Sequence, residues 1–275
     1  MNISIDSCAD LSRDLVDAHH LRMIPLHVMV NEVDYFDNDL TLEQLFFSVQ
    51  QTDNLPKTAA PSVQEFIHFF DVDEPVIYIG LSSQLSATMQ NAHLASDQLQ
   101  KPDLYLIDSL NLSTGIGLLA LKASDLQKEG KPVDEIVKQI KALRSKVSTS
   151  FVIDTMEYLH KGGRCTGLQA FVGSMLKIRP IIYVQEDGKL GVLDKVRGSR
   201  KKALDTLLAG FVADLPSVDL KRVFVTHSGC QEDATYLAEE LQKLVPIQDV
   251  FITMAGATIG SHCGPNTIGI LYIRE

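Results

Sequence analysis

Hydrophobic and polar positions alternate along the first half of the chain in a pattern typical of a sheet covered by helices. Short apolar runs rich in β-formers predict four strands, at residues 2–6, 76–81, 104–108 and 151–154. The clearest amphipathic stretch is 133–147, where apolar residues recur every three or four positions and predict a helix. Thr41 and Ser62 each stand three residues before a Gln or Glu, so we expect a capping box and a helix start at both.

The second half of the chain has a different pattern. Two β-rich runs, 181–184 and 190–196, flank an Asp-Gly pair, which predicts a hairpin of antiparallel strands. Further helices are expected at 201–215 and 232–244, and further strands at 222–226, 250–254 and 268–273. Because the pattern changes near Gly162, we predict an α/β fold of two domains. Residues 1–160 would hold a mainly parallel sheet flanked by helices, and residues 161–275 a mixed or antiparallel sheet.

Composition narrows the classes of function. The chain has 275 residues, of which 45% are hydrophobic, so it can bury a large core and is not disordered. Its 25 basic and 35 acidic side chains give a net charge of −10, which argues against nucleic-acid binding. We expect a cytoplasmic protein without a transmembrane segment, because no apolar run approaches the roughly 20 residues that span a bilayer and the start does not resemble a signal peptide. The four cysteines form no C-x-x-C pair, so neither a disulfide framework nor a metal site is expected.

Several hydroxyl side chains lie at the ends of predicted strands or helices. Such positions face the crevice outside the sheet, where α/β proteins bind their ligands. Ser7 follows the first strand, Ser86 and Thr88 follow the second, and Thr58 precedes a helix. Such hydroxyls can bind an anion together with the free amides of a first helical turn. The same residue types are also ordinary helix caps, so both interpretations stay open.

Two later segments also carry candidate chemistry. Gly162 and Gly163 can turn successive amides toward an anion, and Arg164 adds a fork suited to a carboxylate or phosphate. A turn that links two domains would use the same residues. His262 lies among glycines and a proline, where we expect a rigid loop that holds the imidazole for proton exchange. A structural role for a lone histidine remains the alternative.

Common nucleotide and esterase motifs are absent from the sequence, which has neither a P-loop nor a G-x-S-x-G elbow. Six residues separate a relaxed dinucleotide fingerprint at 115–120 from the predicted strand end at Asp108, whereas that motif needs its glycine turn directly after the strand. A hydrolase or transferase that uses Ser86 or Cys263 with His262 stays open, because such partners meet only in space. Asp6 could complete a triad with Ser86 and His262.

Six segments, taken in order, resemble the DegV family and span nearly the whole chain. They are D-S-C-A-D-L at 6–11, K-T-A-A-P-S at 57–62, L-S-S-Q-L-S-A-T at 81–88, I-D-S at 107–109 with T-G-I-G at 114–117, D-T-M-E-Y-L-H-K-G-G-R at 154–164, and H-C-G-P at 262–265. Members of this family resemble the FakB subunits of bacterial fatty acid kinase. The resemblance implies a lipid-binding subunit, not itself an enzyme, that holds a long-chain fatty acid between two domains. A separate kinase subunit, FakA, would convert the presented carboxylate to an acyl phosphate, and no cofactor besides the bound fatty acid is implied.

The resemblance also assigns roles to single residues. Six are expected to bind the ligand or flank it: Thr58, Ser86, His262, Ser7, Thr88 and Arg164. Of these, Thr58 and Ser86 would hydrogen-bond the carboxylate, with His262 close to the head group. Arg164 would lie near the pocket mouth. Apolar candidates for the lining of an acyl tunnel are Ile24, Leu26, Val28, Phe171, Val172, Met175 and Leu176.

A basic cluster stands where the family has a similar positive stretch, and on so acidic a chain it could dock the kinase subunit. It comprises Arg197, Arg200 and Lys201, together with Lys195 and Lys202. A solvated helix start is the alternative interpretation.

The chain departs from the family pattern at five positions: it has Ala87 and Asn266 in place of Gly, Ala59-Ala60 in place of Ser-Gln, and Cys8 in place of Thr. These changes leave open a different small carboxylate or carbonyl ligand.

Overall fold

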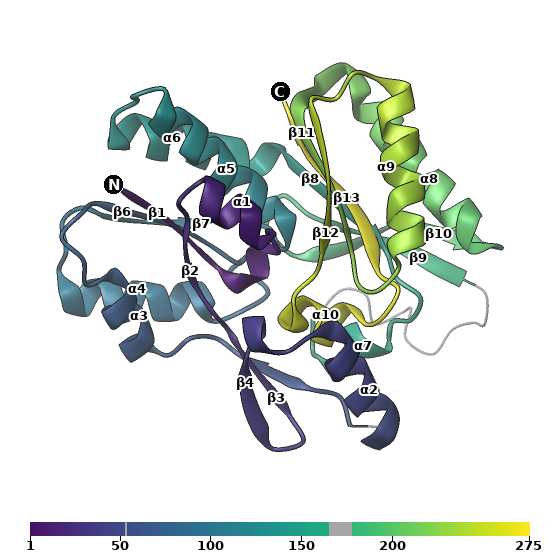
Figure 1. Ribbon diagram of the computed structural model, residues 1–275, viewed down its shortest axis with the longest axis horizontal. Helices are drawn as coiled ribbons and strands as arrows, with labels where there is room; N and C mark the ends of the chain where they lie inside the picture. Colours follow the sequence, from purple (N-terminus) through teal and green to yellow (C-terminus); the bar gives the residue numbers. More distant parts are fainter. Residues whose placement is uncertain (53, 165–177) are drawn as a thin grey trace.

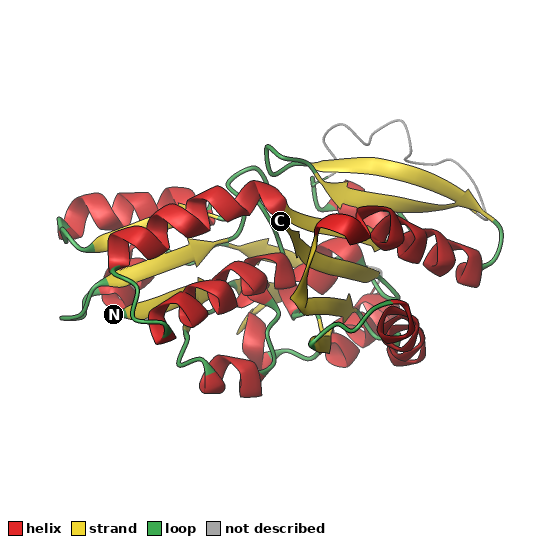
Figure 2. Ribbon diagram, turned by 90° about the horizontal axis from the view of Figure 1, so that it is seen from above, coloured by secondary structure: helices red, strands yellow, loops and turns green. Residues whose placement is uncertain are grey.

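Two sheets with their helices stand side by side, and a small third sheet lies below them in the view of Figure 1. The computed structural model describes residues 1–52, 54–164 and 178–275. Seen from above, the strands of the two larger sheets run between layers of helices (Figure 2). No helix in these three ranges is long and apolar enough to cross a membrane.

The first sheet is parallel throughout. In spatial order its strands are β2 (Arg22–Ile24), β1 (Asn2–Asp6), β6 (Val76–Gly80) and β7 (Leu104–Asp108). Every residue of β6 is buried, as expected for a central strand that is covered on both faces. One face carries α3 (Val63–Phe70) and α4 (Thr88–Leu99), and the other carries α5 (Thr114–Lys128) and α6 (Val133–Leu143) (Figure 1).

The second sheet is mixed, which confirms the fold class. In spatial order its strands are β10 (Leu190–Arg197), β9 (Ile178–Val184), β8 (Val147–Val152), β13 (Ile268–Arg274), β11 (Val218–His227) and β12 (Asp249–Met254). Only β11 and β12 pair in parallel among these strands, and β9 with β10 forms the expected hairpin. Two helices, α8 (Arg200–Asp214) and α9 (Gln231–Leu244), cover one face.

Helix α5 joins the two sheets into one core. It packs on β1 and β6 of the first sheet and on β8, β11 and β13 of the second. Its first turn contains the glycines of the rejected dinucleotide fingerprint. A Cβ at Gly115 would lie 2.2 Å from Asn111 Oδ1, and one at Gly117 would lie 2.6 Å from Leu11 Cδ2. These glycines therefore permit close packing of the helix against its neighbours.

Several sequence predictions are confirmed, and the bounds of several elements are wrong. Thr41 precedes α2 (Leu42–Thr52) with a reciprocal Thr-Gln cap, and Ser62 forms a full capping box on α3. The helix predicted at 133–147 ends at Leu143, and the strand predicted at 151–154 is β8, which begins at Val147. Val147 fits the helical period, but burial alternates from this residue onward because it begins a strand.

Strand β8 also belongs to a different sheet from the one expected. It was predicted with the strands of the first half, yet it pairs with β9 and β13. Sheet membership thus changes between β7 and β8, upstream of residue 160. The domain boundary near that residue stays a prediction.

A third sheet, which no sequence pattern predicts, is antiparallel and has the order β4 (Val33–Phe36), β3 (His27–Val30), β5 (Lys57–Ala59). Strands of three or four residues are too short to show a period of two. The remaining helices are also short: α1 (Arg13–Ala18), α7 (Glu157–Lys161) and α10 (Ala257–Cys263). Val28, Val30 and Ala257 share an apolar cluster, which holds the third sheet against α10.

Candidate functional site

A cavity of about 280 Å³ opens at the carboxyl ends of the first sheet, the edge where α/β folds bind ligands. Loops after β6 and β7 form one wall, and β5, α7, α10 and the start of β10 supply the others. The described lining residues are Leu26, Thr58, Ala59, Ala60, Leu81, Leu85, Ser86, Ala87, Leu112, Leu159, Arg164, Leu190, Thr258, Ile259, His262 and Cys263. Aliphatic side chains predominate, so the cavity suits an apolar ligand with one polar end.

One hydrogen bond crosses this cavity wall between the two halves of the chain. Thr58 Oγ1 lies 2.8 Å from His262 Nε2. The segment that carries Thr58 precedes α3, as expected, and Thr58 itself lies in β5, where it pairs with buried Val28 and shares its inward face. His262 was expected on a rigid loop, but it lies in the last turn of α10, which Gly264 ends with a φ of +76°.

His262 is neutral, because burial and the nearby Arg164 lower its pKa to about 4. Its Nδ1 is buried and has no hydrogen-bond partner among the described residues. A proton on Nδ1 would leave a buried donor unsatisfied, which costs more than an unused acceptor. The proton is therefore on Nε2, which donates to Thr58 Oγ1. The Thr58 hydroxyl then keeps its own hydrogen to donate to a ligand.

The two glycines of the K-G-G-R segment do not form an anion nest. The Gly162 amide donates to Tyr158 O (2.8 Å) and the Gly163 amide donates to His160 O (3.0 Å), so both are used in the end of α7. A Cβ at Gly162 would lie 2.4 Å from His262 Nδ1. Gly162 is thus required because α7 and the imidazole approach so closely.

Ser86 lines the cavity and also hydrogen-bonds Thr88, the first residue of α4. Its Oγ accepts the Thr88 amide hydrogen at 3.2 Å and lies 2.8 Å from Thr88 Oγ1. Thr88 begins α4, is fully buried, and is not among the described residues that line the cavity. The N-cap residue of α4 is Ala87, so neither Ser86 nor Thr88 is the helix cap that the sequence offered as the alternative. Ligand binding by Ser86 stays a prediction.

Arg164 lies where the cavity meets a more open hollow of about 400 Å³. Leu85, Ser86 and Ala87 line both spaces with it. The guanidinium is half-buried, with Nε donating to Leu85 O (3.0 Å) and Nη1 donating to Gly162 O (2.6 Å). Arg164 therefore brings positive charge to the mouth while two of its donors bind backbone carbonyls.

Ser7 is not among the described lining residues either. Its hydroxyl donates to Asp37 Oδ2 (2.6 Å) and accepts the Leu26 amide hydrogen (3.0 Å). Asp37 belongs to a group of three buried carboxylates with Asp6 and Asp10, and burial raises the pKa of each, to about 6 for Asp6. Asp37 was not among the candidate residues, because it follows β4, a strand too short to be predicted from the sequence.

The hydrolase arrangements are not formed. Burial raises the pKa of the Cys263 thiol to about 12, so the reactive thiolate is disfavoured. The described partner of His262 is Thr58, whereas the Ser86 hydroxyl pairs with Thr88. Asp6, the expected third member of a triad, instead accepts hydrogen bonds from Tyr78, Leu81 and Cys8. In the ranges that the structure describes, no group of His, Cys, Asp and Glu side chains is placed to hold a metal ion.

Comparison with known proteins gives one result that covers the whole chain. The model for "Uncharacterised protein, DegV family" matches residues 1–275. The chain belongs to the DegV family. A fatty acid-binding protein from Thermotoga maritima is 30% identical over 279 residues, which cover 98% of this chain and 96% of that protein.

Solved DegV-family structures share the fold. A structure that shows fatty acid binding by a DegV family protein from Thermus thermophilus has a TM-score of 0.91 at 28% identity, covering 100% of this chain and 99% of that one. The Fatty Acid Kinase (Fak) B3 protein from Streptococcus pneumoniae, solved with linoleic acid, has a TM-score of 0.87 at 24% identity and full coverage of both chains. The likeness to the Fak B3 protein shows only that the two chains share a fold.

The departures from the DegV pattern fall mainly on the cavity wall. Ala59, Ala60 and Ala87 all line it, and Cys8 is fully buried behind it. Asn266 has a φ of +58°, a left-handed conformation that Gly adopts freely and that Asn tolerates better than most residues. This substitution therefore preserves the local backbone.

Of the apolar residues expected to line a tunnel in this DegV chain, Leu26 lines the cavity, whereas Ile24 and Val28 lie in separate apolar clusters. The other four, Phe171, Val172, Met175 and Leu176, lie outside the described residues. Six aliphatic lining residues were not among the candidates, because only the fold brings them together: Leu81, Leu85, Leu112, Leu159, Leu190 and Ile259.

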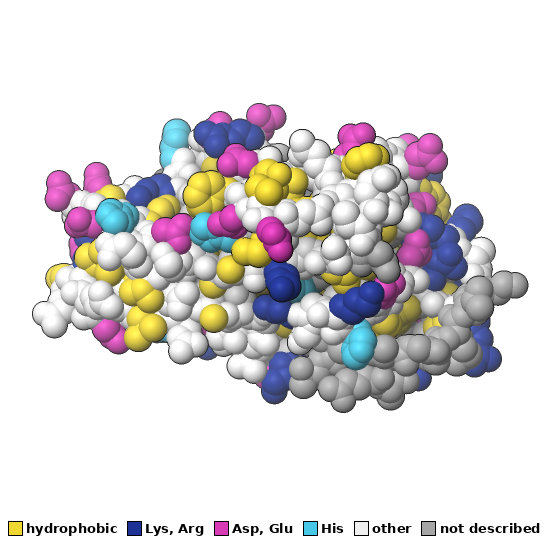
Figure 3. All heavy atoms as spheres, turned by 90° about the horizontal axis from the view of Figure 1, so that it is seen from below, with side chains coloured by type: hydrophobic (Ala, Val, Ile, Leu, Met, Phe, Trp, Pro, Cys, Tyr) yellow, Lys and Arg dark blue, Asp and Glu magenta, His cyan; other side chains and the backbone are white. Residues whose placement is uncertain are grey.

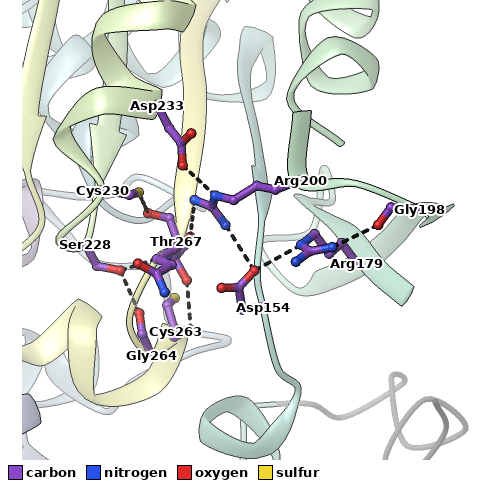
Figure 4. A network of polar contacts seen from close by, with 11 residues as sticks. Asp154, Arg179, Gly198, Arg200, Ser228, Cys230, Asp233, Cys263, Gly264 and Thr267 are labelled. Atoms are coloured by element: carbon purple, nitrogen blue, oxygen red, sulfur yellow. Dashed lines mark hydrogen bonds and ion pairs between the residues drawn. The ribbon is translucent and has the colours of Figure 1, made fainter. Parts of the chain in front are cut away.

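Two of the predicted docking cations, Arg200 and Lys201, form ion pairs within the fold, and Figure 4 shows those of Arg200. The Arg200 guanidinium donates hydrogen bonds to the carboxylates of Asp233 and Asp154 (3.0 Å) and to the Asn266 carbonyl (2.8 Å). It therefore ties the start of α8 to its neighbours. Lys201 pairs with Asp205 at 2.9 Å.

Arg197 is exposed, so docking through Arg197 and Lys201 stays a prediction. On the face shown in Figure 3, basic and acidic side chains lie side by side and do not gather into one positive patch.

The buried neutral imidazole predicts an acid-sensitive fold. Between pH 6.5 and 4 the unfolded chain takes up a proton at residue 262 and the folded chain does not, so the free energy of unfolding falls. Relative to His262→Gln, the wild type should lose about 3 kcal/mol by pH 4. Urea unfolding at several pH values measures this loss, and the same substitution at exposed His68 is the control. Parallel pH profiles for the wild type and His262→Gln would contradict a buried neutral His262.

Proposed function

We propose that this DegV-family chain binds one long-chain fatty acid, with the carboxylate at Thr58 and Ser86 and the acyl chain in the aliphatic part of the cavity. The observation that carries the proposal is the hydroxyl of Thr58, which neutral His262 orients at the polar end of a predominantly aliphatic cavity. The Thermotoga and Thermus relatives, which are named for fatty acid binding, support it.

The polar end suits a carboxylate that must remain reactive. Thr58 and Ser86 offer neutral hydroxyl donors, and His262 is uncharged. Arg164 contributes positive charge at the mouth, but two of its donors already bind carbonyls. A carboxylate held in this way is hydrogen-bonded without being locked into a buried ion pair.

The apolar part supplies the affinity. An acyl chain of about 15 methylenes gains about 12 kcal/mol on leaving water, at roughly 0.8 kcal/mol for each methylene. Immobilising the ligand and desolvating its head group offset part of this gain. The hydroxyls therefore fix orientation, and the aliphatic walls hold the ligand.

We further propose that the carboxylate is presented to a separate cytoplasmic kinase subunit. The open hollow beside Arg164 adjoins the polar end, and phosphoryl transfer requires a donor that approaches in line. The sequence lacks a P-loop, so ATP would be bound by the partner. Exposed Arg197 and Lys201 are the proposed docking residues.

Thr58→Val removes the proposed donor and nearly conserves volume. We expect fatty-acid affinity to fall about tenfold to a hundredfold, equivalent to roughly 1–3 kcal/mol, because a charge-assisted bond is lost. Thr58→Ser retains the hydroxyl and serves as the matched control. Isothermal titration with a long-chain fatty acid measures both, and equal affinities for Thr58→Val and the wild type would refute the assignment.

Acyl phosphate formation separates the proposed roles of the two subunits. With ATP and a fatty acid, acyl phosphate should form only when a kinase subunit is added, because this chain has no P-loop. Trapping the product with hydroxylamine measures it. Turnover by this chain alone would overturn the proposal of a non-catalytic subunit.

A further inference from the structure

Two buried carboxylates cap helix α10 from distant parts of the chain. The N-cap of α10 is Gly256, which has no side chain to accept a hydrogen bond. Asp10 Oδ1 accepts the Gly256 amide hydrogen at 2.8 Å, and Asp37 Oδ1 accepts the Thr258 amide hydrogen at 2.7 Å. These acceptors precede the amides by 246 and 221 residues. The first half of the chain thus supplies the cap for a helix near the other end.

Both carboxylates are fixed in place. Asp10 is 6% exposed and Asp37 is 3% exposed. The second oxygen of each accepts a serine hydroxyl, from Ser113 for Asp10 and from Ser7 for Asp37, at 2.6 Å in both cases. The partial positive charge at the start of a helix favours carboxylates in this position.

The residue between the carboxylates must be small. A Cβ at Gly256 would lie 3.0 Å from Asp37 Oδ1 and 3.3 Å from Asp10 Oδ1. A larger residue would press on both acceptors. Gly256 therefore lets the two carboxylates reach the same helical turn.

Helix α10 forms the part of the cavity wall that carries His262. Ile259, His262 and Cys263 all line the cavity, within two turns of the capped end. A helix of seven residues is not stable alone, so its position depends on tertiary anchors. A shift at the cap would therefore move His262 relative to Thr58 and Gly162.

We propose that Asp10 and Asp37 are positioning residues of the carboxylate-binding site, because they hold α10 so that His262 stays buried against Thr58. Ser7 acts with them through Asp37 instead of touching the ligand. The inference depends on the proposed function only in experiments that measure fatty-acid affinity. The position of His262 can be tested in the ligand-free protein.

Asp37→Ala tests the inference, with the protonation of His262 followed by NMR between pH 4.5 and 8. If α10 is released, the imidazole gains water and its pKa rises toward the ordinary value of 6.5. Loss of a negative charge would by itself shift the pKa downward, so the sign of the change separates the two effects. Amide exchange at Thr258 should also become about tenfold faster, because its acceptor is gone.

Asp37→Asn keeps an acceptor oxygen and should retain slow exchange at Thr258 and a low pKa for His262. Asp125→Asn is the matched control, because Asp125 is a buried carboxylate that pairs with Lys221 and Arg222 and not with α10. This substitution should leave the pKa of His262 unchanged even if it lowers the stability of the fold.

Fatty-acid affinity should fall about tenfold in Asp37→Ala and stay within about twofold in Asp125→Asn. If the wild type binds no fatty acid, the proposed function fails, and the titration and exchange data still decide the role of Asp37. A folded Asp37→Ala protein with unchanged His262 protonation and Thr258 exchange would overturn the inference. If Asp37→Ala fails to fold, Ser7→Ala takes its place as the test. Smaller changes of the same sign in the pKa of His262 and in the amide exchange of Thr258 would support the inference. The absence of any change in either quantity would overturn it.

Discussion

The contact between Thr58 and His262 is the interaction on which the candidate site depends. It joins residues 204 positions apart and brings β5 and α10 to one wall of the cavity. The pairing of β5 with β3 fixes the position of Thr58. The close approach of Gly162 and the capped helix α10 fix the position of His262. The imidazole is kept neutral by burial, so the contact fixes the direction in which the Thr58 hydroxyl can donate.

The long, periodic elements of this fold could be predicted from the sequence, whereas the elements that build the site could not. Strands β1 and β7 and the capping box at Ser62 follow from local patterns that the structure retains. Strand β5 and helix α10 are too short to show a period, and tertiary packing stabilises them. Local sequence patterns therefore select Thr58 and His262 but do not predict the strand and the helix in which they lie.

Polar residues near the cavity divide into those that face it and those that support its wall. Hydroxyl residues look alike in sequence, because a Ser or Thr after a strand can cap a helix or bind an anion. The structure separates them, since Ser86 lines the cavity and Ser7 bonds Asp37 behind it. Arg200 was similarly expected at the surface, and its internal ion pairs arise from residues that only the fold brings near.

Denaturing mass spectrometry of an organic extract from the purified protein, beside a control protein prepared identically, tests whether the cavity holds one fatty acid. We expect a long-chain fatty acid in about equal amount to the protein, because an aliphatic cavity with a hydroxyl-lined end retains such a ligand. A protein that carries none and fails to take up added fatty acids would contradict the account.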